Sequence, residues 1–349
     1  MKQLQPTEYM YASARIRSQE KYLVGRERLD VLAEAPTGRE VMERLAEYGL
    51  TPPEVEDGTG ATDRGPLTDS EAMSLAREGM LLAILRNAYR EVETAVPDPT
   101  VFRYFRYPYD ANNLKAAVKC AIRGISAADM LFDFGTVPAD RVEALVRDGD
   151  LRDFPPAMAA ATPRAREAYD RTGDPREIDV ILDRACFSDM LDAVTATGET
   201  TLIGWLRARI DLTNILICLR ILRMKQGEAA RPFLASALLP GGTLEESFFL
   251  DAYAGGEGGL WDALVPTPYA VLGRVEGEVR PLSLVERAAD DCHMNLVRDG
   301  ARVPFGAPVV GGYLYGCETA VKNLRILLAA KDAGLSPDTL RERMRVSYV

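Results

Sequence analysis

Apolar residues recur at spacings of three and four residues along almost the whole of this 349-residue chain. That spacing follows one face of an α-helix, whereas the alternation typical of a half-buried strand is confined to short stretches beside proline or glycine. The pattern therefore predicts an all-α protein. Proline and glycine mark the ends of the expected helices, which cover Tyr11–Leu32, Thr37–Tyr48, Thr68–Val96, Ala111–Arg123, Pro138–Arg147, Pro155–Tyr169, Pro175–Thr195 and Thr200–Gln226.

Three connecting segments have signatures of their own. The stretch Thr51–Pro66 is rich in proline, glycine and acidic residues, which favours an exposed loop. Thr243 followed by Glu246 matches a capping box, so we expect it to open a helix that continues through Tyr253. The tract Gly255–Gly259 lacks the GxGxxG spacing of a dinucleotide loop, and we expect a flexible connection between helices there.

The charge balance and the scarcity of histidine exclude several classes of function. Acidic residues outnumber basic ones by 52 to 42, and the resulting formal charge of −10 disfavours nucleic acid as a partner. His293 is the only histidine, which excludes metal sites that need two imidazoles, such as HExxH zinc centres. The five cysteines are scattered without a CxxC motif, which predicts reduced core residues. No metal and no cofactor are therefore expected.

Candidate catalytic groups are few. Asp290 and Asp291 form an adjacent acidic pair without the DDxxD spacing that presents two carboxylates to magnesium. Cys292 and His293 are also adjacent, and side chains at i and i+1 diverge on a helix, which disfavours a nucleophile and its base. The sequence has no GxxxxGK[ST] phosphate loop and no GxSxG elbow. We predict a non-catalytic protein; the alternatives are a helical enzyme with a carboxylate and arginine pocket for a small molecule, and a generic helical scaffold.

Hydropathy gives no sign of a leader or a membrane span. Met1–Leu23 carries charged residues and has no apolar core, so no signal peptide is predicted and the cytoplasm is the expected compartment. The best apolar run, Ile215–Leu222, is interrupted by Arg220 and is far shorter than the roughly 20 residues that cross a bilayer. Any attachment to a membrane is therefore expected to go through a partner.

Asparagines recur in similar helical surroundings about every hundred residues. Each of the three precedes a branched apolar residue, and the spacings between them are 101 and 109 residues. In the first two copies an aspartate stands three positions earlier, on the same helix face. An unpaired buried amide costs about 1 to 3 kcal/mol, so we expect each asparagine to bond to a neighbouring helix and fix its register. The predicted repeat anchors are Asp110, Asn113, Asp211, Asn214, Asn323 and Arg325.

The third asparagine is too near the end of the sequence to head a full repeat, because only 26 residues follow Asn323. About a hundred residues precede the first anchor, so the amino-terminal helices can complete this unit and close three copies into a ring-like whole. The predicted division is residues 1–105 packing with residues 306–349 as one repeat, residues 106–200 as the second and residues 201–305 as the third.

Arginine is strongly preferred to lysine in this chain, and its planar guanidinium suits paired contacts with the carboxylates of another protein. Solvated helix surface is the simpler interpretation for any one of these residues, because exposed ion pairs contribute little. The candidate contacts with a partner are Arg15, Arg17, Lys115, Arg341 and Arg345.

Four helical segments occur in a characteristic order: Tyr9–Leu23, Tyr109–Lys119, Asp211–Lys225 and Tyr313–Met344. Together they resemble the C subunit of prokaryotic V-type and A-type ATPases, the counterpart of the eukaryotic vacuolar ATPase d subunit. The resemblance covers nearly the whole chain. The sequence departs from the family pattern at Ala320, where the family usually has an acid, so a smaller polar contact is expected in the third copy.

The resemblance implies an all-helical protein of three pseudo-threefold-related domains that form a funnel. Such a subunit has no active site. It lies between the membrane rotor ring and the central stalk, so stalk subunits and ring subunits are the implied partners, and attachment to the membrane is peripheral. It transmits the torque that couples ATP turnover to proton or sodium ion transport.

Overall fold

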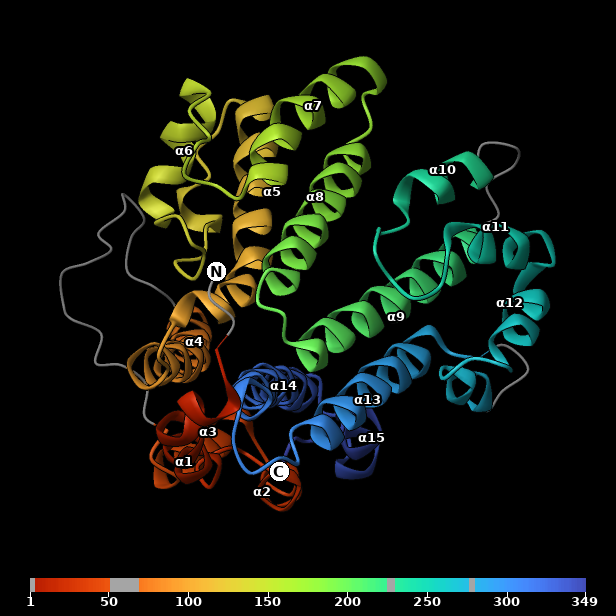
Figure 1. Ribbon diagram of the computed structural model, residues 1–349. Coiled ribbons are helices and arrows are strands. Elements are labelled where there is room, and N and C mark those ends of the chain that lie inside the picture. The colour runs from red at the N-terminus through yellow and green to blue at the C-terminus, as the bar shows by residue number, and fades with distance from the viewer. Residues whose placement is uncertain (1–3, 51–68, 225–229, 276–279) are drawn as a thin grey trace. The chain divides into compact units, whose positions relative to one another are not determined.

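The computed structural model describes residues 4–50, 69–224, 230–275 and 280–349. Fifteen α-helices and four short 3₁₀ helices occur in these ranges, and no strand does (Figure 1). The all-α prediction is thereby confirmed. None of the described helices combines the length and the apolar composition needed to cross a bilayer. The predicted loop Thr51–Pro66 lies outside the described residues.

The chain divides into two compact units. The first, which we call the terminal unit, contains Gln5–Pro97 and Asp290–Val349 and so joins segments from both ends of the sequence. The second, the middle unit, contains Asp98–Ala289 together with Leu4. The boundary between them falls within helix α13, which covers Leu282–Gly300.

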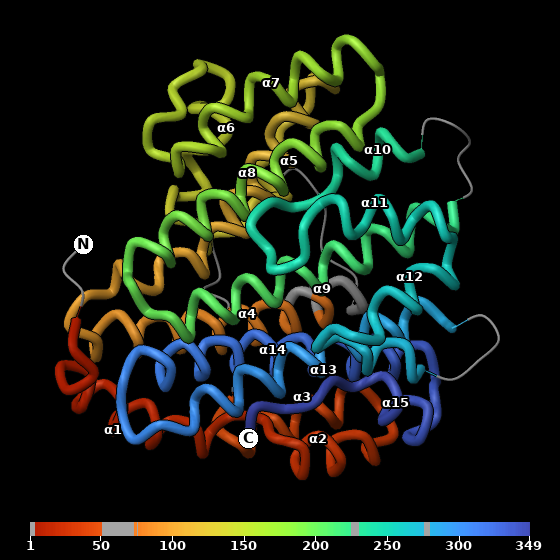
Figure 2. Tube along the Cα trace, turned by 45° about the vertical axis from the view of Figure 1, so that its right-hand side comes forward, coloured from red at the N-terminus to blue at the C-terminus, as the bar shows by residue number. Residues whose placement is uncertain are grey.

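Helix α14 is the core of the terminal unit. It contacts α1, α2, α3, α4 and α15 (Figure 2). It is buried along nearly its whole length, because glycines in its first half allow close approach and leucines at helical spacing fill its second half. The helices of this unit are η1 (Pro6–Tyr9), α1 (Met10–Glu20), α2 (Arg26–Ala33), α3 (Gly38–Glu47), α4 (Asp69–Ala95), α14 (Ala307–Asp332) and α15 (Pro337–Arg343).

Two long helices organise the middle unit. Helix α8 contacts α5, α7, α9 and α10, with α7 running beside it (Figure 1), and α9 contacts α10, α11 and α12. The helices of this unit are η2 (Pro99–Arg106), α5 (Tyr107–Arg123), η3 (Ala128–Met130), α6 (Ala139–Asp148), α7 (Pro156–Thr172), α8 (Arg176–Thr195), α9 (Thr200–Met224), α10 (Ala230–Ala237), α11 (Glu246–Ala254), α12 (Gly256–Leu264) and η4 (Ala270–Arg274).

Charged residues of α8 satisfy the ends of neighbouring helices. The buried carboxylate of Asp189 accepts hydrogen bonds from the N–H groups of Ala157 and Met158, both at 2.9 Å, in the first turn of α7. Arg184 donates to the carbonyl groups of Ser236 and Leu238, where α10 ends. Since free N–H groups and carbonyls at helix ends need partners, these contacts allow the helix ends to be buried.

The predicted helices from Thr37 to Gln226 agree with α3 to α9 to within a few residues at their described ends. The prediction of one helix over Tyr11–Leu32 is wrong, because α1 ends at Glu20 and α2 begins at Arg26. The break contains Gly25, which has an extended backbone (φ −77°, ψ −178°). A Cβ atom on Gly25 would lie 3.0 Å from the backbone oxygen of Val349, so the carboxy-terminal segment packs against the break.

Two further local predictions are wrong. Thr243 does not cap α11, since its N–H and hydroxyl both bond to Asp211 and the N-cap of α11 is Glu245. The tract Gly255–Gly259 is not a flexible connection, because α12 begins at Gly256 and includes most of it. At Thr243 a tertiary contact with Asp211 replaces the predicted capping box. At Gly255–Gly259 a second helix replaces the predicted flexible connection.

Candidate functional site

The three repeated asparagines make the same pair of hydrogen bonds. Each side-chain amide donates through Nδ2 to the carbonyl of one residue and accepts through Oδ1 from the N–H of that same residue. All three side chains are buried, and we call each arrangement an asparagine clamp. The pairs are Asn113 of α5 with Phe132 (2.8 and 2.8 Å), Asn214 of α9 with Leu239 (2.9 and 2.8 Å) and Asn323 of α14 with Arg345 (3.0 and 2.8 Å).

The residues that the clamps hold lie outside helices. The prediction that each asparagine bonds to a neighbouring helix is therefore wrong. The physical reason is that a residue outside a helix can offer both its N–H and its C=O to one side chain, whereas a helix already uses these groups internally. Arg325, the remaining anchor on α14, is not part of a clamp and pairs with Glu78 of α4.

An aspartate adds a second attachment in the first copy. Oδ1 of Asp110 accepts from the N–H groups of Thr136 at 2.8 Å and Val137 at 3.2 Å, and Oδ2 accepts from the Thr136 hydroxyl at 2.8 Å. Thr136 stands four positions after the clamped Phe132. We call this arrangement an aspartate lock, and it ties the loop that leads into α6 to the side of α5.

The second copy repeats the lock at the same offset. Asp211 accepts from the N–H groups of Thr243 at 2.9 Å and Leu244 at 3.0 Å and from the Thr243 hydroxyl, and Thr243 stands four positions after the clamped Leu239. The hydroxyl of Tyr269 also donates to this carboxylate at 2.8 Å. Asp211 therefore satisfies more donors than its counterpart in the first copy.

A glycine precedes the threonine in both locks. A Cβ atom on Gly135 would lie 2.2 Å from Oδ1 of Asp110, and one on Gly242 would lie 2.1 Å from Oδ1 of Asp211. Neither position has room for a side chain while the carboxylate keeps its bonds. The loop thus needs an aspartate, a glycine and a threonine together.

The third copy has the clamp without the lock. Asn323 keeps both hydrogen bonds even though Ala320 stands where the other copies have an aspartate. Beyond the clamped residue, the ring of Tyr348 packs on Gly316, where an added Cβ would lie 2.8 Å from the tyrosine, and its hydroxyl donates to Glu20 at 3.1 Å. The polar contact in this copy is therefore smaller, as expected, because the carboxylate is absent, while the hydrogen bonds of the asparagine are kept.

Sequence reasoning did not find the partners of the aspartates. The signal was a Gly–Thr pair, since Gly135–Thr136 recurs as Gly242–Thr243, 107 residues later. This spacing resembles that of the asparagines, but the pair lies in loops where helical periodicity gives no guidance.

Burial controls the ionisation of the buried acid and thiols. It raises the pKa of Asp110 above its ordinary value of 3.8, although the hydrogen bonds from Thr136 act in the opposite direction. Burial also raises the pKa of the Cys218 thiol to about 12 and that of Cys317 to about 12. Both thiols are therefore protonated near neutral pH and are poor nucleophiles.

The residues considered as catalytic candidates have other partners. Asp290 accepts from Lys322 at 2.5 Å and from Arg345 at 2.9 Å, while Asp291 accepts from the N–H of Val346 at 2.6 Å. The ring of His293 lies edge-on to Tyr315, with 5.0 Å between ring centres. No cluster of three or more histidine, cysteine or acidic side chains suited to a metal ion occurs within the described ranges.

The cations considered as partner contacts all have a partner within their own unit. Arg345 is the most buried of them, with a side chain that is 13% exposed. The ion pairs are Arg15 with Glu91, Arg17 with Glu20, Lys115 with Asp183, Arg341 with Asp30, Glu34 and Asp338, and Arg345 with Asp290.

Known proteins resemble this chain over most of its length. The C subunit of the V-type sodium ATPase of Enterococcus hirae is 22% identical over 262 residues, which cover 74% of this chain and 79% of the relative. The C subunit of the A-type ATP synthase of Methanocaldococcus jannaschii is 25% identical over 357 residues, covering 95% and 85% respectively. That of Thermococcus onnurineus is 25% identical over 349 residues, covering 96% and 90%.

A family model provides the broader assignment. The model described as ATP synthase (C/AC39) subunit matches residues 12–343, which is nearly the whole chain. It extends over both units and includes all three asparagine clamps except the clamped residue Arg345. The resemblance noted in the sequence is confirmed, and the chain belongs to the ATP synthase (C/AC39) subunit family.

Proposed function

We propose that this chain is a non-catalytic rotor subunit of a V-type or A-type ATPase. In this role it joins the central stalk to the membrane rotor ring and transmits the torque that couples ATP turnover to proton or sodium ion transport. The observation that carries the proposal is the family match over residues 12–343, together with relatives that are named as the C subunits of such complexes.

The clamps and locks support a mechanical role. A body that transmits torque must resist shear between its helices, and free loops would let those helices slide. Here the loops that follow η3 and α10 are fixed to the sides of α5 and α9 by buried amide and carboxylate groups. Fully satisfied buried polar networks of this kind favour one rigid arrangement over others.

The same contacts support three repeats. The asparagines are 101 and 109 residues apart, and the residues that they clamp are 107 and 106 residues apart. We infer that residues 1–105 with 306–349, residues 106–200 and residues 201–305 are three copies of one helical unit, arranged with pseudo-threefold symmetry as a funnel. The terminal unit, built from both ends of the chain, agrees with the first of these copies being composite.

The proposed contacts with stalk or ring subunits are five cations: Arg15, Arg17, Lys115, Arg341 and Arg345. Each already pairs with a carboxylate of this chain. A carboxylate of the partner subunit would therefore have to bind the cation beside that residue or replace it. Attachment to the membrane would then be peripheral and would go through the ring.

Copurification tests this function against the enzyme and scaffold alternatives. The chain would carry an affinity tag in its native cell and be isolated from gently solubilised membranes. We expect stalk and ring subunits of one ATPase to accompany it in fixed proportion, and an equally tagged unrelated helical protein to bring down neither. Isolation of the chain alone, with turnover of a small molecule, would support the enzyme alternative instead.

A further inference from the structure

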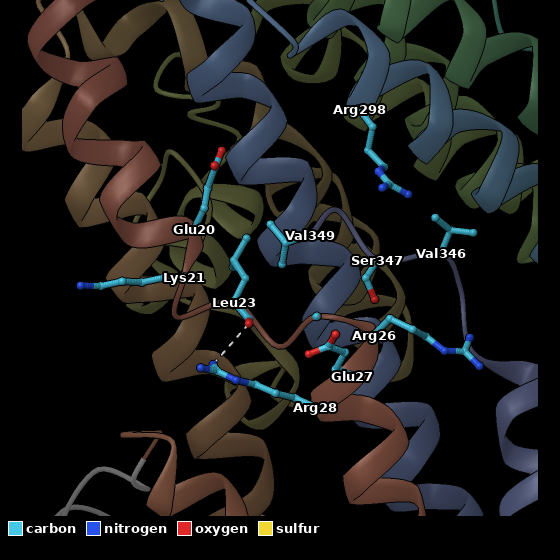
Figure 3. Close-up of a pocket in the computed structure, with 11 residues that line it drawn as sticks. Glu20, Lys21, Leu23, Arg26, Glu27, Arg28, Arg298, Val346, Ser347 and Val349 are labelled. Atoms are coloured by element: carbon cyan, nitrogen blue, oxygen red, sulfur yellow. Dashed lines mark hydrogen bonds between the residues drawn. The ribbon is translucent and has the colours of Figure 1, made fainter. Parts of the chain in front are cut away.

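A cavity in the terminal unit has no part in the clamps or locks. Its volume is about 770 Å³, and it lies between the turn joining α1 to α2, the end of α13 and the carboxy-terminal segment (Figure 3). Arg298, Ser347 and the first residues of α2 are among its lining residues. These three elements supply hydrogen-bond donors that the described part of the chain leaves unused.

Helix α2 begins at this cavity. Its N-cap residue, Gly25, has no side chain that could bond to the first turn. Within the described residues, the backbone N–H groups of Arg26, Glu27 and Arg28 make no hydrogen bond. Free N–H groups at the start of a helix, together with the helix dipole, favour a bound anion.

Ser347 provides a second, independent donor. Ser347 is only 8% exposed, and its hydroxyl has no hydrogen-bond partner in the described part of the chain. Figure 3 shows the hydroxyl directed toward the start of α2. Since a buried hydroxyl without a partner is unfavourable, a ligand that accepts its hydrogen bond would remove that cost.

Arg298 provides a third donor, from the last turn of α13. It lines the cavity, and no acidic residue of the described chain pairs with it. Arg26, on the facing side, is already paired with Asp30 at 3.0 Å. Arg28 also lines the cavity, but its guanidinium donates to the carbonyl groups of Tyr22 and Leu23. Arg298 is therefore the guanidinium of this lining that keeps its donors for a ligand.

We propose that this cavity binds a phosphate group through the first-turn N–H groups of α2, the hydroxyl of Ser347 and the guanidinium of Arg298. Donors from three segments suit a tetrahedral group with several acceptor oxygens better than a planar carboxylate with two. Glu20 and Glu27 also line the cavity. Arg17 pairs with Glu20 at 2.8 Å, whereas the carboxylate of Glu27 repels such a ligand. The proposal does not depend on the rotor function.

Calorimetric titration of the full chain with inorganic phosphate, with ionic strength held constant by chloride, tests the site. We expect saturable binding to one site. Arg298→Gln should weaken it about tenfold through loss of a charge-assisted bond, and Ser347→Ala about threefold through loss of a neutral one. Glu27→Gln should tighten it. Arg302→Gln is the control, because Arg302 is exposed, pairs with Asp299 and does not line the cavity.

A second experiment identifies the source of the phosphate. The chain would be sedimented with phosphatidylcholine vesicles with and without phosphatidylglycerol. Sedimentation that needs the anionic lipid and is lost in Arg298→Gln indicates a lipid headgroup, whereas titration binding without sedimentation indicates free phosphate. Melting curves show that the variants are folded. The site is refuted if the folded wild-type chain binds neither inorganic phosphate, titrated to about 10 mM, nor the anionic vesicles. It is also refuted if Arg298→Gln and Ser347→Ala bind as the wild-type chain does.

Discussion

The second clamp in the middle unit and the third clamp in the terminal unit hold their loops by the same asparagine geometry but differ in everything around it. Asn214 and Asn323 each bond to both backbone groups of one residue outside the helices. Beside Asn214, Asp211 accepts hydrogen bonds from the loop and from Tyr269, whereas Ala320 occupies the equivalent place beside Asn323.

The difference shows which part of the arrangement does which job. An amide is sufficient to hold a loop residue, because it matches one N–H and one C=O without any charge. The aspartate is found where the chain must turn back through Gly–Thr toward another helix, and its carboxylate then gathers the N–H groups of that turn. In the third copy Tyr348 follows the clamped residue instead and packs against glycines of α14.

Removing the lock of the second copy should have the largest effect. Asp211→Ala leaves the donors of Thr243, Leu244 and Tyr269 without their acceptor, so we expect the free energy of unfolding to fall by about 4 kcal/mol. Asp110→Ala loses fewer bonds and should cost about 3 kcal/mol. Urea unfolding followed by circular dichroism measures both. Equal costs, or a larger cost at Asp110, would contradict the comparison.

The reverse substitution sharpens the same point. Ala320→Asp places a carboxylate at a buried position of α14 where no Gly–Thr turn supplies donors. We expect a loss of about 3 kcal/mol, because a buried charge without partners is costly. If urea unfolding shows no loss of stability, a carboxylate at this position does not need the donors of a Gly–Thr turn. The aspartate, the glycine and the threonine of a lock would then not depend on one another.

The glycines of the locks should be nearly as sensitive. Gly135→Ala and Gly242→Ala each place a Cβ atom against the carboxylate, and we expect a cost of about 2 to 3 kcal/mol. The cost should shrink when the aspartate is also replaced by alanine, which a double-mutant cycle measures. Gly204→Ala is the matched control: nothing lies near its Cβ within α9, so it should stabilise the chain by about 0.5 to 1 kcal/mol.

The clamps themselves should cost similar amounts in the two units. Asn214→Leu and Asn323→Leu each leave the N–H and the carbonyl of the clamped residue without their partner, so we expect about 2 kcal/mol for each and a difference below about 1 kcal/mol. Chemical melts of the two variants decide the matter. A much smaller cost at Asn323 would mean that the clamp depends on the neighbouring aspartate.

Much of the fold was accessible from the sequence, since apolar spacing predicts the helices and proline or glycine marks their ends. The asparagines and aspartates were also accessible, because their helical surroundings repeat. Their partners were not, because the clamped residues follow 19, 25 and 22 positions later in loops without periodicity. The break near Gly25 was missed for a related reason: Val349, far along the chain, packs against it.

Titration of Asp110 should give the smallest effect. Its folded pKa is raised by burial above 3.8, so the folded state disfavours ionisation relative to the unfolded state. The contribution of Asp110 to the free energy of unfolding is fully present below the pKa that this group has in the unfolded state. It is lost as the pH rises through the pKa that the group has in the folded state. Asp110→Asn should therefore cost more at about pH 3.5 than at about pH 7. In Asp150→Asn the trend should reverse, because Arg152 lowers the pKa of Asp150 to about 2.

Ion transport by membranes that carry the ATPase without this chain tests the central claim most directly. ATP hydrolysis and ATP-driven ion uptake would be measured in vesicles from a deletion strain, before and after purified chain is added. We predict that the vesicles hydrolyse ATP without driving uptake and that the added chain restores uptake. Undiminished uptake in the absence of the chain would contradict a role in connecting stalk and ring.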